Sequence, residues 1–211
     1  QVLTMPHFEE TIRKAIHTGS AIFPISLVVA NDLYPKTGKL YLSGILAILA
    51  VILMIVDLLK ARYKPFKSFM MHLFGKVLRK NELQGGMTAS TIVVASAAFT
   101  ILIFRVEIAV VVLLFLSLGD SAAALVGKHF GRIRTVGSRT LEGSLAAFNT
   151  CLVISLFALW VSPEFGWYLS PAALLVGSVV ATLSELVYMP LDDNFRIPVF
   201  AGLAMELVLP G

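Results

Sequence analysis

Long apolar runs alternate with short polar segments along the whole chain, and this pattern predicts membrane-spanning helices. Crossing the hydrocarbon core of a bilayer takes about 20 apolar residues in helical form, and several runs approach that length. Glycine and proline in the intervening segments, such as Pro35, Gly38 and Pro190, interrupt the helical pattern. We therefore predict seven spans, at residues 20–31, 40–59, 87–104, 106–126, 144–161, 172–189 and 195–209.

No repeat or linker interrupts this series, so residues 1–211 are expected to form one integral-membrane domain. The expected fold class is all-α: a polytopic transmembrane helix bundle of about seven spans. Residues 1–19 mix charged and apolar positions, as in a helix that enters the membrane from its surface. The alternative for the first run is a signal peptide cleaved near residues 28–30, which its mixed-charge leader and short apolar stretch disfavour.

The composition agrees with a membrane protein and excludes several other classes. Hydrophobic residues make up 57% of the 211 residues and charged residues 14%, with a mean hydropathy of +0.86, whereas soluble domains are about 25% charged. The single cysteine, Cys151, excludes an intramolecular disulfide and a cysteine metal cluster. The net charge of +4 does not indicate a nucleic-acid partner, because the basic residues stand between apolar runs, where they set orientation and contact anionic membrane lipids.

The segment 60–80 is the most basic part of the chain, with seven Lys or Arg residues and no acid. Apolar residues recur in it at helical spacing, at positions 66, 69, 70, 73, 77 and 78. This pattern is typical of a basic amphipathic helix that lies in the membrane interface. His72 lies within this segment, and we interpret it as a surface histidine.

The distribution of positive charge predicts the orientation. With the amino terminus in the cytoplasm and seven spans, the cytoplasmic segments are 1–19, 60–86, 127–143 and 190–196. They hold 14 of the 17 Lys and Arg residues and leave only Lys36, Lys39 and Arg105 on the other side. This asymmetry follows the positive-inside rule.

The segment Gly119–Ser144 combines acids, bases, glycines and hydroxyls, and it is the candidate functional loop. Four cations follow Asp120 with no acid before Glu142, and glycines are interspersed among them. A phosphate-rich ligand with its metal ion requires such cations and carboxylates. The alternative is a basic loop that only orients the protein. Carboxylates at the ends of three spans (Glu82, Asp120 and residues 192–193) argue against that alternative, because acids contribute little to orientation.

Several familiar catalytic motifs are absent from the sequence. Gly127-Lys128-His129 lacks the hydroxyl residue of a P-loop, and there is no dinucleotide-binding glycine motif, HExxH or protein-kinase signature. Carboxylates suited to Mg²⁺, cations suited to phosphate and a lipid-facing scaffold remain. Together they favour phosphoryl or nucleotidyl transfer at the membrane surface.

The chain resembles the membrane-bound lipid-alcohol kinases that include dolichol kinase, phytol kinase and the CTP-dependent diacylglycerol kinase. GDSAAALVGKHFGR (119–132) and SRTLEGS (138–144) match their G-D-x-x-A-x-x-x-G-[KR]-x-x-G-[KR] and [KR]-[ST]-x-E-G-S blocks. RKAIH (13–17) is similar to their R-K-x-x-H, and DDNFRIP (192–198) to their D-D-N-x-x-I-P. Residues 82–90 match an E-x-x-x-G segment more weakly. Arg139 departs from the commoner lysine but retains its charge.

The resemblance implies transfer of the γ-phosphoryl group of CTP, or of ATP, to the hydroxyl of a lipid alcohol. The chain is compact beside the dolichol kinases, which carry extra amino-terminal spans. This difference favours a phytol-like or diacylglycerol-like substrate. Asp120 with Asp192 or Asp193 is expected to hold Mg²⁺, and one carboxylate to accept the alcohol proton. Glu142 is expected to be a second metal ligand or to fix Arg139. The expected nucleotide-binding residues are Lys128, Arg132 and Arg139, the backbone around Gly127 and Gly131, and Thr140 and Ser144.

Each of these residues also has a structural interpretation. Glu142 suits the positive end of a helix dipole, residues 192–194 suit an N-cap, and Gly127 with Gly131 suits close helix packing. Glu185 is expected to pair with a cation or to lie near a lipid headgroup. The further candidates are Arg13, Lys14 and His17, for phosphate or anionic lipid, together with Glu82 and Asn194.

Two other functions remain as alternatives. A phosphatidate cytidylyltransferase also uses CTP and Mg²⁺ in a multi-span protein, but its late lysine-aspartate core is missing here. A transporter or lipid-binding protein requires polar residues in the middle of several spans, and few are present. The sequence leaves open the identity of the alcohol, the choice between CTP and ATP, and the oligomeric state, a homo-oligomer included.

Overall fold

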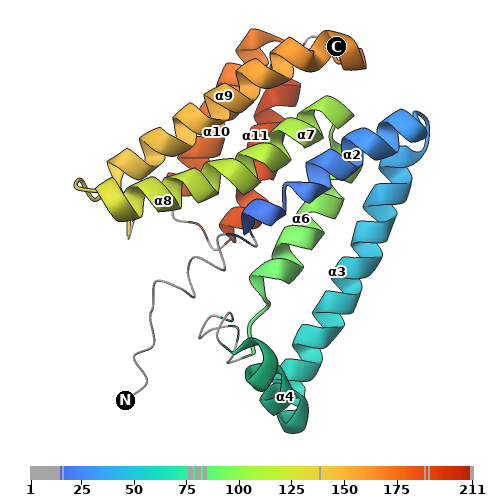
Figure 1. The fold of residues 1–211 in the computed structure, drawn as a ribbon, viewed down its shortest axis with the longest axis vertical. Coiled ribbons are helices and arrows are strands. Elements are labelled where there is room, and N and C mark those ends of the chain that lie inside the picture. Colours follow the sequence, from blue (N-terminus) through green and yellow to red (C-terminus); the bar gives the residue numbers. More distant parts are fainter. Residues whose placement is uncertain are drawn as a thin grey trace.

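The computed structural model describes residues 15, 17–75, 78, 82, 85–137, 139–187, 189 and 191–209. This part of the chain is all-α and forms no β-strand, which confirms the predicted class. In chain order (Figure 1) the helices are α2 (Ile22–Leu33), α3 (Gly38–Arg62), α4 (Lys64–Phe74), α6 (Ala89–Ile103), α7 (Val106–Leu114), the π-helical turn η1 (Phe115–Gly119), α8 (Asp120–Phe130), α9 (Leu141–Phe165), α10 (Pro171–Leu186) and α11 (Asp193–Val208).

Every predicted apolar run coincides with a helix. The helices Gly38–Arg62, Val106–Phe130 and Leu141–Phe165 are each long and apolar enough to cross a membrane, and Ala89–Ile103 and Pro171–Leu186 are shorter apolar helices. Membrane insertion of helices is thus supported by length and composition. The total of seven spans and the cytoplasmic amino terminus stay predictions.

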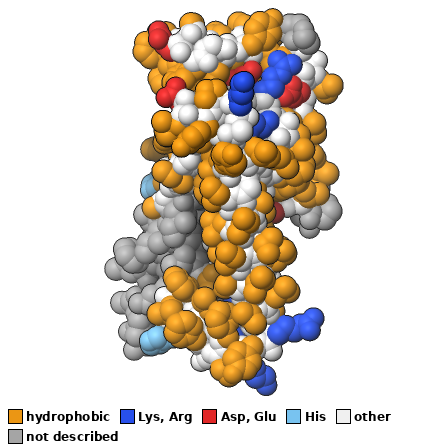
Figure 2. All heavy atoms as spheres, turned by 90° about the vertical axis from the view of Figure 1, so that its right-hand side faces the viewer, with side chains coloured by type: hydrophobic (Ala, Val, Ile, Leu, Met, Phe, Trp, Pro, Cys, Tyr) orange, Lys and Arg blue, Asp and Glu red, His pale blue; other side chains and the backbone are white. Residues whose placement is uncertain are grey.

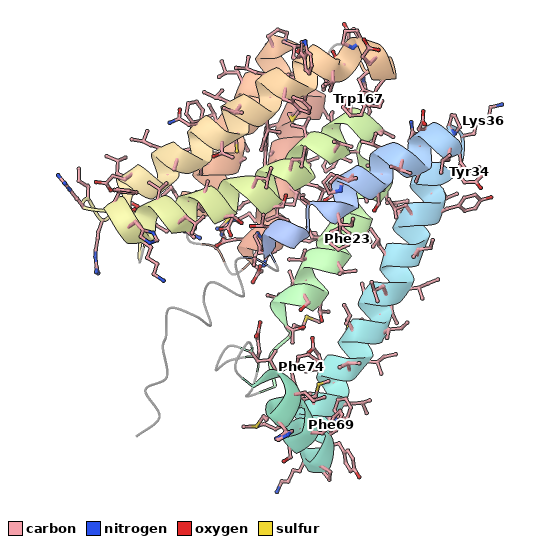
Figure 3. All side chains as sticks on the ribbon, viewed as in Figure 1. Phe23, Tyr34, Lys36, Phe69, Phe74 and Trp167 are labelled. Atoms are coloured by element: carbon pink, nitrogen blue, oxygen red, sulfur yellow. The ribbon has the colours of Figure 1, made fainter. Side chains whose placement is uncertain are left out.

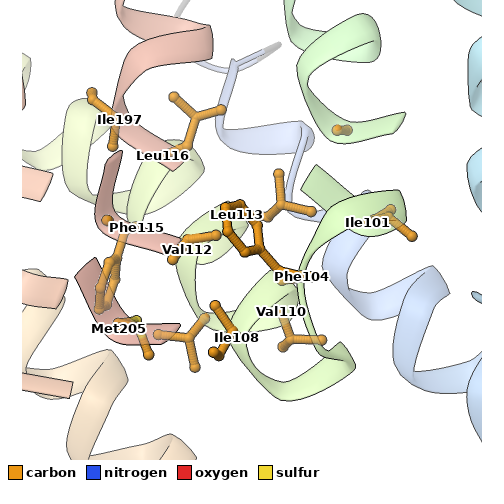
Figure 4. Packing of buried hydrophobic residues seen from close by; sticks show 14 of the residues in the cluster. Ile101, Phe104, Ile108, Val110, Val112, Leu113, Phe115, Leu116, Ile197 and Met205 are labelled. Carbon is orange, nitrogen blue, oxygen red and sulfur yellow. The ribbon is translucent and has the colours of Figure 1, made fainter. Parts of the chain in front are cut away.

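The centre of the bundle is the helix formed by α7, η1 and α8, which runs without interruption from Val106 to Phe130. Residues 108–113 are all buried, because α2, α6, α9 and α11 surround α7. Figure 4 shows Phe104, Ile108, Phe115 and Met205 in the core that these helices share. The buried part of the central helix therefore fixes the position of Asp120, the first residue of α8.

Two glycines allow α11 to approach its neighbours closely. A Cβ on Gly202 would lie 2.6 Å from the ring of Phe104, and a Cβ on Gly177 of α10 would lie 2.6 Å from the Met205 side chain. Ser155 of α9 and Ser178 of α10 add a buried hydrogen bond of 3.0 Å between their hydroxyl groups. Small residues and interhelical hydroxyl bonds are the usual means by which helices associate in a membrane.

The outer face of α3 is apolar over its length. Its exposed side chains include large hydrophobic ones at positions 45, 48, 52, 55 and 59. Figure 2 shows hydrophobic side chains over the middle of this face, with Lys and Arg side chains toward the two ends. Such a face suits contact with lipid chains.

The two ends of the molecule differ in character. Tyr34, Lys36 and Trp167 lie at one end, and Phe69 and Phe74 of α4 lie at the opposite end (Figure 3). No residue of α4 is buried, which agrees with the predicted interfacial helix. Lysines 76 and 80 and Arg79 of the predicted basic segment lie outside the described residues.

Candidate active site

Asp120 begins α8 directly after the π-helical turn, and it contacts His17, which precedes α2 in the chain. Its Oδ2 lies 3.4 Å from Nε2 of His17, which is also 3.1 Å from the carbonyl oxygen of Leu116. Because a carbonyl oxygen only accepts, Nε2 carries the hydrogen in that bond. Thr18 donates a second bond, of 2.8 Å, to the hydroxyl of Ser121. The structure therefore brings together two predicted candidates, His17 and Asp120, at a π-helical turn of the kind often found at functional sites.

The glycines of the candidate loop hold α8 close to α9. A Cβ on Gly127 would lie 2.9 Å from Oγ1 of Thr140, and one on Gly131 would lie 2.6 Å from the Thr140 methyl carbon. A Cβ on Gly143 would lie 2.8 Å from the carbonyl oxygen of Ala123. The packing interpretation of these glycines is thus supported, because Gly127 and Gly131 both lie against Thr140 at the beginning of α9.

Thr140, Glu142 and Ser144 stabilise the beginning of α9. Thr140 is the N-cap and accepts a bond of 3.2 Å from the Gly143 N–H, while the Ser144 hydroxyl donates to the Thr140 carbonyl oxygen. The Glu142 carboxylate accepts from the N–H of Ile133, at 3.2 and 3.3 Å. Glu142 therefore closes the loop onto α9, and the expected link from Glu142 to Arg139 is replaced by this backbone bond.

A cavity of about 370 Å³ opens beside this loop. Lys128 and Arg132, two of the predicted phosphate-binding residues, have exposed side chains in the same segment. The guanidinium group of Arg132 and the carboxylate of Glu142 both lie at this cavity. The cavity is lined by His129, Phe130, Gly131, Arg132 and Glu142.

Arg139 contacts the ends of α10 and α11, which lie far from it in the sequence. One of its terminal nitrogens donates to Oδ2 of Asp193, and its Nε lies 3.6 Å from Oε1 of Glu185. Asp193 also accepts from Arg196 through Oδ1. Three of the predicted site residues, Arg139, Asp193 and Glu185, are thus joined, and Arg196 is an addition that the motif comparison did not select.

Asp192 is the N-cap of α11. Its Oδ1 accepts from the backbone N–H of Asn194 at 2.9 Å and from the Asn194 side-chain amide at 2.7 Å. The capping interpretation of this segment is therefore supported.

The predicted metal ligands are not gathered into one cluster. Within the described ranges, no group of three or more His, Cys, Asp or Glu side chains is placed to hold a metal ion. Asp193 is engaged by two guanidinium groups, and Asp120 faces His17. Mg²⁺ at nucleotide sites commonly uses one or two carboxylates together with phosphate oxygens, and the role of Asp120 in holding Mg²⁺ stays a prediction.

A second polar cluster lies near the carboxyl-terminal end of α3. The sequence pattern did not reveal it. Asp57 and Lys60 are 5% and 2% exposed and pair at 2.8 Å. Oδ2 of Asp57 accepts from the Thr88 N–H and the Thr91 hydroxyl, at 2.9 and 2.7 Å. Lys60 also donates to the Gly86 carbonyl oxygen at 3.2 Å. Lys60 is therefore buried, in contrast to its expected place in the interfacial segment.

Glu82 belongs to the same region. It is buried, and its Oε1 accepts from the N–H of Ala89 at 2.8 Å, in the first turn of α6. Asp57 and Glu82 thus both serve the amino-terminal end of α6, where unpaired N–H groups attract carboxylates. The remaining candidates, Arg13 and Lys14, lie outside the described residues.

Comparison with known proteins supports the resemblance noted from the motifs. The chain is 28% identical to CTP-dependent diacylglycerol kinase 1 of Saccharomyces cerevisiae over 183 residues, which is 75% of this chain and 61% of that relative. It is 24% identical to the Schizosaccharomyces pombe protein of the same name, over 95% of this chain and 94% of the relative. A dolichol kinase of S. cerevisiae is 35% identical over 46% of this chain and 19% of its own length.

The relatives confirm that the chain is similar to CTP-dependent lipid-alcohol kinases. The chain spans about three fifths of the length of the S. cerevisiae diacylglycerol kinase. No protein-family model matches it, and no solved structure is significantly similar.

Proposed function

We propose that this chain is a membrane-embedded lipid-alcohol kinase that transfers the γ-phosphoryl group of CTP to the hydroxyl of a diacylglycerol-like lipid. One observation carries the proposal. Arg139 of the cationic loop pairs with carboxylates at the ends of two apolar helices, Glu185 of α10 and Asp193 of α11. The matches to proteins named diacylglycerol kinases cover 75% and 95% of the chain, against 46% for the dolichol kinase, and this favours diacylglycerol as the first acceptor to test.

The loop between α8 and α9 would bind the triphosphate. Lys128 and Arg132 are exposed, and Arg132 lines the cavity together with Gly131. Arg139 lies at the other end of the loop. Phosphoryl transfer depends mainly on positioning and on neutralising charge, and guanidinium groups suit phosphate oxygens because they donate two parallel bonds.

Asp120 fits the chemistry of a magnesium ligand. Its carboxylate supplies the hard oxygen donors that Mg²⁺ prefers, and its side chain is 23% exposed. When bound there, Mg²⁺ would neutralise charge on the phosphates. The rigid central helix sets the position of Asp120, and His17 restrains one carboxylate oxygen.

The seven helices would cross the bilayer with the amino terminus in the cytoplasm. The positive-inside count places the loop and the start of α11 on the cytoplasmic side, where nucleotides are present. The lipid hydroxyl would then reach the site from the membrane interface.

A transfer assay tests this proposal. The full chain, purified in detergent, is given Mg²⁺, γ-labelled CTP or ATP, and diacylglycerol, phytol or dolichol in turn. We expect label in the lipid fraction with CTP and diacylglycerol, and a loss of at least about 100-fold for Asp120→Asn, as for removal of one charge-stabilising group. The variant should keep the helical content of the native chain. Transfer by Asp120→Asn near the native rate would refute the role of Asp120.

A further inference from the structure

Arg196 is buried to an extent that is unusual for a charged side chain. It is 2% exposed and is the largest fully buried side chain in the described part of the chain, followed in α11 by buried Ile197, Pro198 and Val199. Removing a guanidinium group from water costs several kcal/mol unless partners compensate. A residue that only had to fill this space would be better apolar, so its charge requires an explanation.

The guanidinium group of Arg196 has a single carboxylate partner among the described residues. It donates to Oδ1 of Asp193, one turn earlier in α11, while its Nε is buried without a hydrogen-bond partner. The other oxygen of Asp193 accepts from Arg139. Asp193 therefore connects a buried arginine to a partly exposed one that belongs to the candidate nucleotide loop.

The charges of this chain of contacts depend on Arg196. Arg139 lies between two carboxylates, Asp193 and Glu185, which would neutralise it and leave an excess of negative charge. Arg196 restores balance, because it takes up one oxygen of Asp193. Two guanidinium groups then face two carboxylates, so these four side chains no longer present a net negative charge to an incoming anion.

We propose that Arg196 is a positioning residue for phosphate binding, acting through Asp193 on Arg139. This inference rests on the proposed function, because it takes Arg139 as a ligand of the triphosphate. It assigns Asp193 to holding arginines and leaves the Mg²⁺ role to Asp120. Arg196 stands at a variable position of the D-D-N-x-x-I-P block, so the resemblance to the kinases does not predict it.

Stability separates this role from a purely structural one. Removing one partner of an ion pair is costly mainly when the other charge is left buried and unpaired. Asp193 keeps Arg139 as a partner, and its side chain is 37% exposed. Arg196→Met should therefore unfold at the native temperature or above it, and yet bind phosphate more weakly.

The experiment is a calorimetric titration of the full chain in detergent with inorganic tripolyphosphate, and then with CTP, each with Mg²⁺. We expect Arg196→Met to weaken both affinities about tenfold, the effect of one charge-assisted contact. Arg196→Lys keeps the charge but loses the planar set of donors of the guanidinium group. It should weaken both affinities by about threefold. Arg139→Met combined with Arg196→Met should bind no more weakly than Arg139→Met alone, because both act on one contact.

Arg105→Met is the matched control. Arg105 pairs with Glu206 near the other end of α11, at 3.4 Å, and should not affect tripolyphosphate binding. An Arg196→Met variant that binds like the native chain, or whose effect adds in full to that of Arg139→Met, overturns the proposal. If Arg196→Met does not fold, an unchanged affinity of Arg196→Lys overturns it. Tripolyphosphate binding without lipid phosphorylation would instead refute the proposed function alone, whereas a native chain that binds neither probe refutes both.

Discussion

Removing the carboxylate of Asp57 should be among the most destabilising single changes in this protein. Asp57→Leu leaves the ammonium group of Lys60, 2% exposed, with the Gly86 carbonyl oxygen as its one remaining partner among the described residues. Breaking a buried pair in this way costs about 3–5 kcal/mol. The amino-terminal end of α6 also loses the acceptor of the Thr88 N–H, which costs about 1 kcal/mol. We therefore expect a loss of roughly 4–6 kcal/mol.

A second substitution should recover most of that loss. In the double variant Asp57→Leu with Lys60→Met, neither charge of this pair stays buried. The remaining cost is the lost hydrogen bond to α6, about 1 kcal/mol. Unfolding by sodium dodecyl sulfate in mixed micelles, followed by circular dichroism, measures both values. Asp32→Leu is the control, because Asp32 is exposed and its replacement should change stability by less than about 0.5 kcal/mol.

The reasoning is wrong if Asp57→Leu costs less than about 1 kcal/mol, since the buried pair would then contribute little. It is equally wrong if the double variant is as unstable as Asp57→Leu. In that case the lost hydrogen bonds to α6, and not the buried unpaired Lys60, would account for the loss of stability.

Two further predictions follow from the loop and from the core. Arg132→Met should raise the KM for the nucleotide about tenfold in steady-state kinetics. Arg134 lies outside the cavity lining, so Arg134→Met should raise the KM less than threefold. Equal effects of the two variants would contradict the role of Arg132 in nucleotide binding. Gly177→Val should lower the free energy of unfolding by about 1–3 kcal/mol, because its Cβ would lie 2.6 Å from Met205. A native unfolding midpoint for that variant would show that α10 and α11 separate easily.

The positions of the helices could be predicted from sequence because each apolar run is bounded by polar or turn-forming residues. The run at 40–59, for example, corresponds to α3 at Gly38–Arg62. The π-helical turn at Phe115–Gly119 could not be predicted in this way, since the mostly apolar run of α7 continues through it without a turn-forming break. It arises from packing around the central helix and leaves no periodic signal of its own.

The site was predictable in its residue types but not in its contacts. The sequence identified Arg139 and Asp193, yet 54 positions separate them, and only the fold shows that they pair. Asp57 was overlooked because a single acid within an apolar run barely alters its hydropathy. The spacing of Asp57 and Lys60, three positions apart, was the available signal, because such residues lie on one face of a helix.

The central claim, that the chain transfers a phosphoryl group to a lipid alcohol, is tested most directly with CTP labelled separately at its α and γ phosphorus atoms. The purified chain is incubated with Mg²⁺ and diacylglycerol, and the lipid and aqueous fractions are counted. The account predicts γ-label in the lipid and α-label in aqueous CDP. α-Label in the lipid upon addition of phosphatidate, with release of pyrophosphate, would indicate a cytidylyltransferase and contradict it.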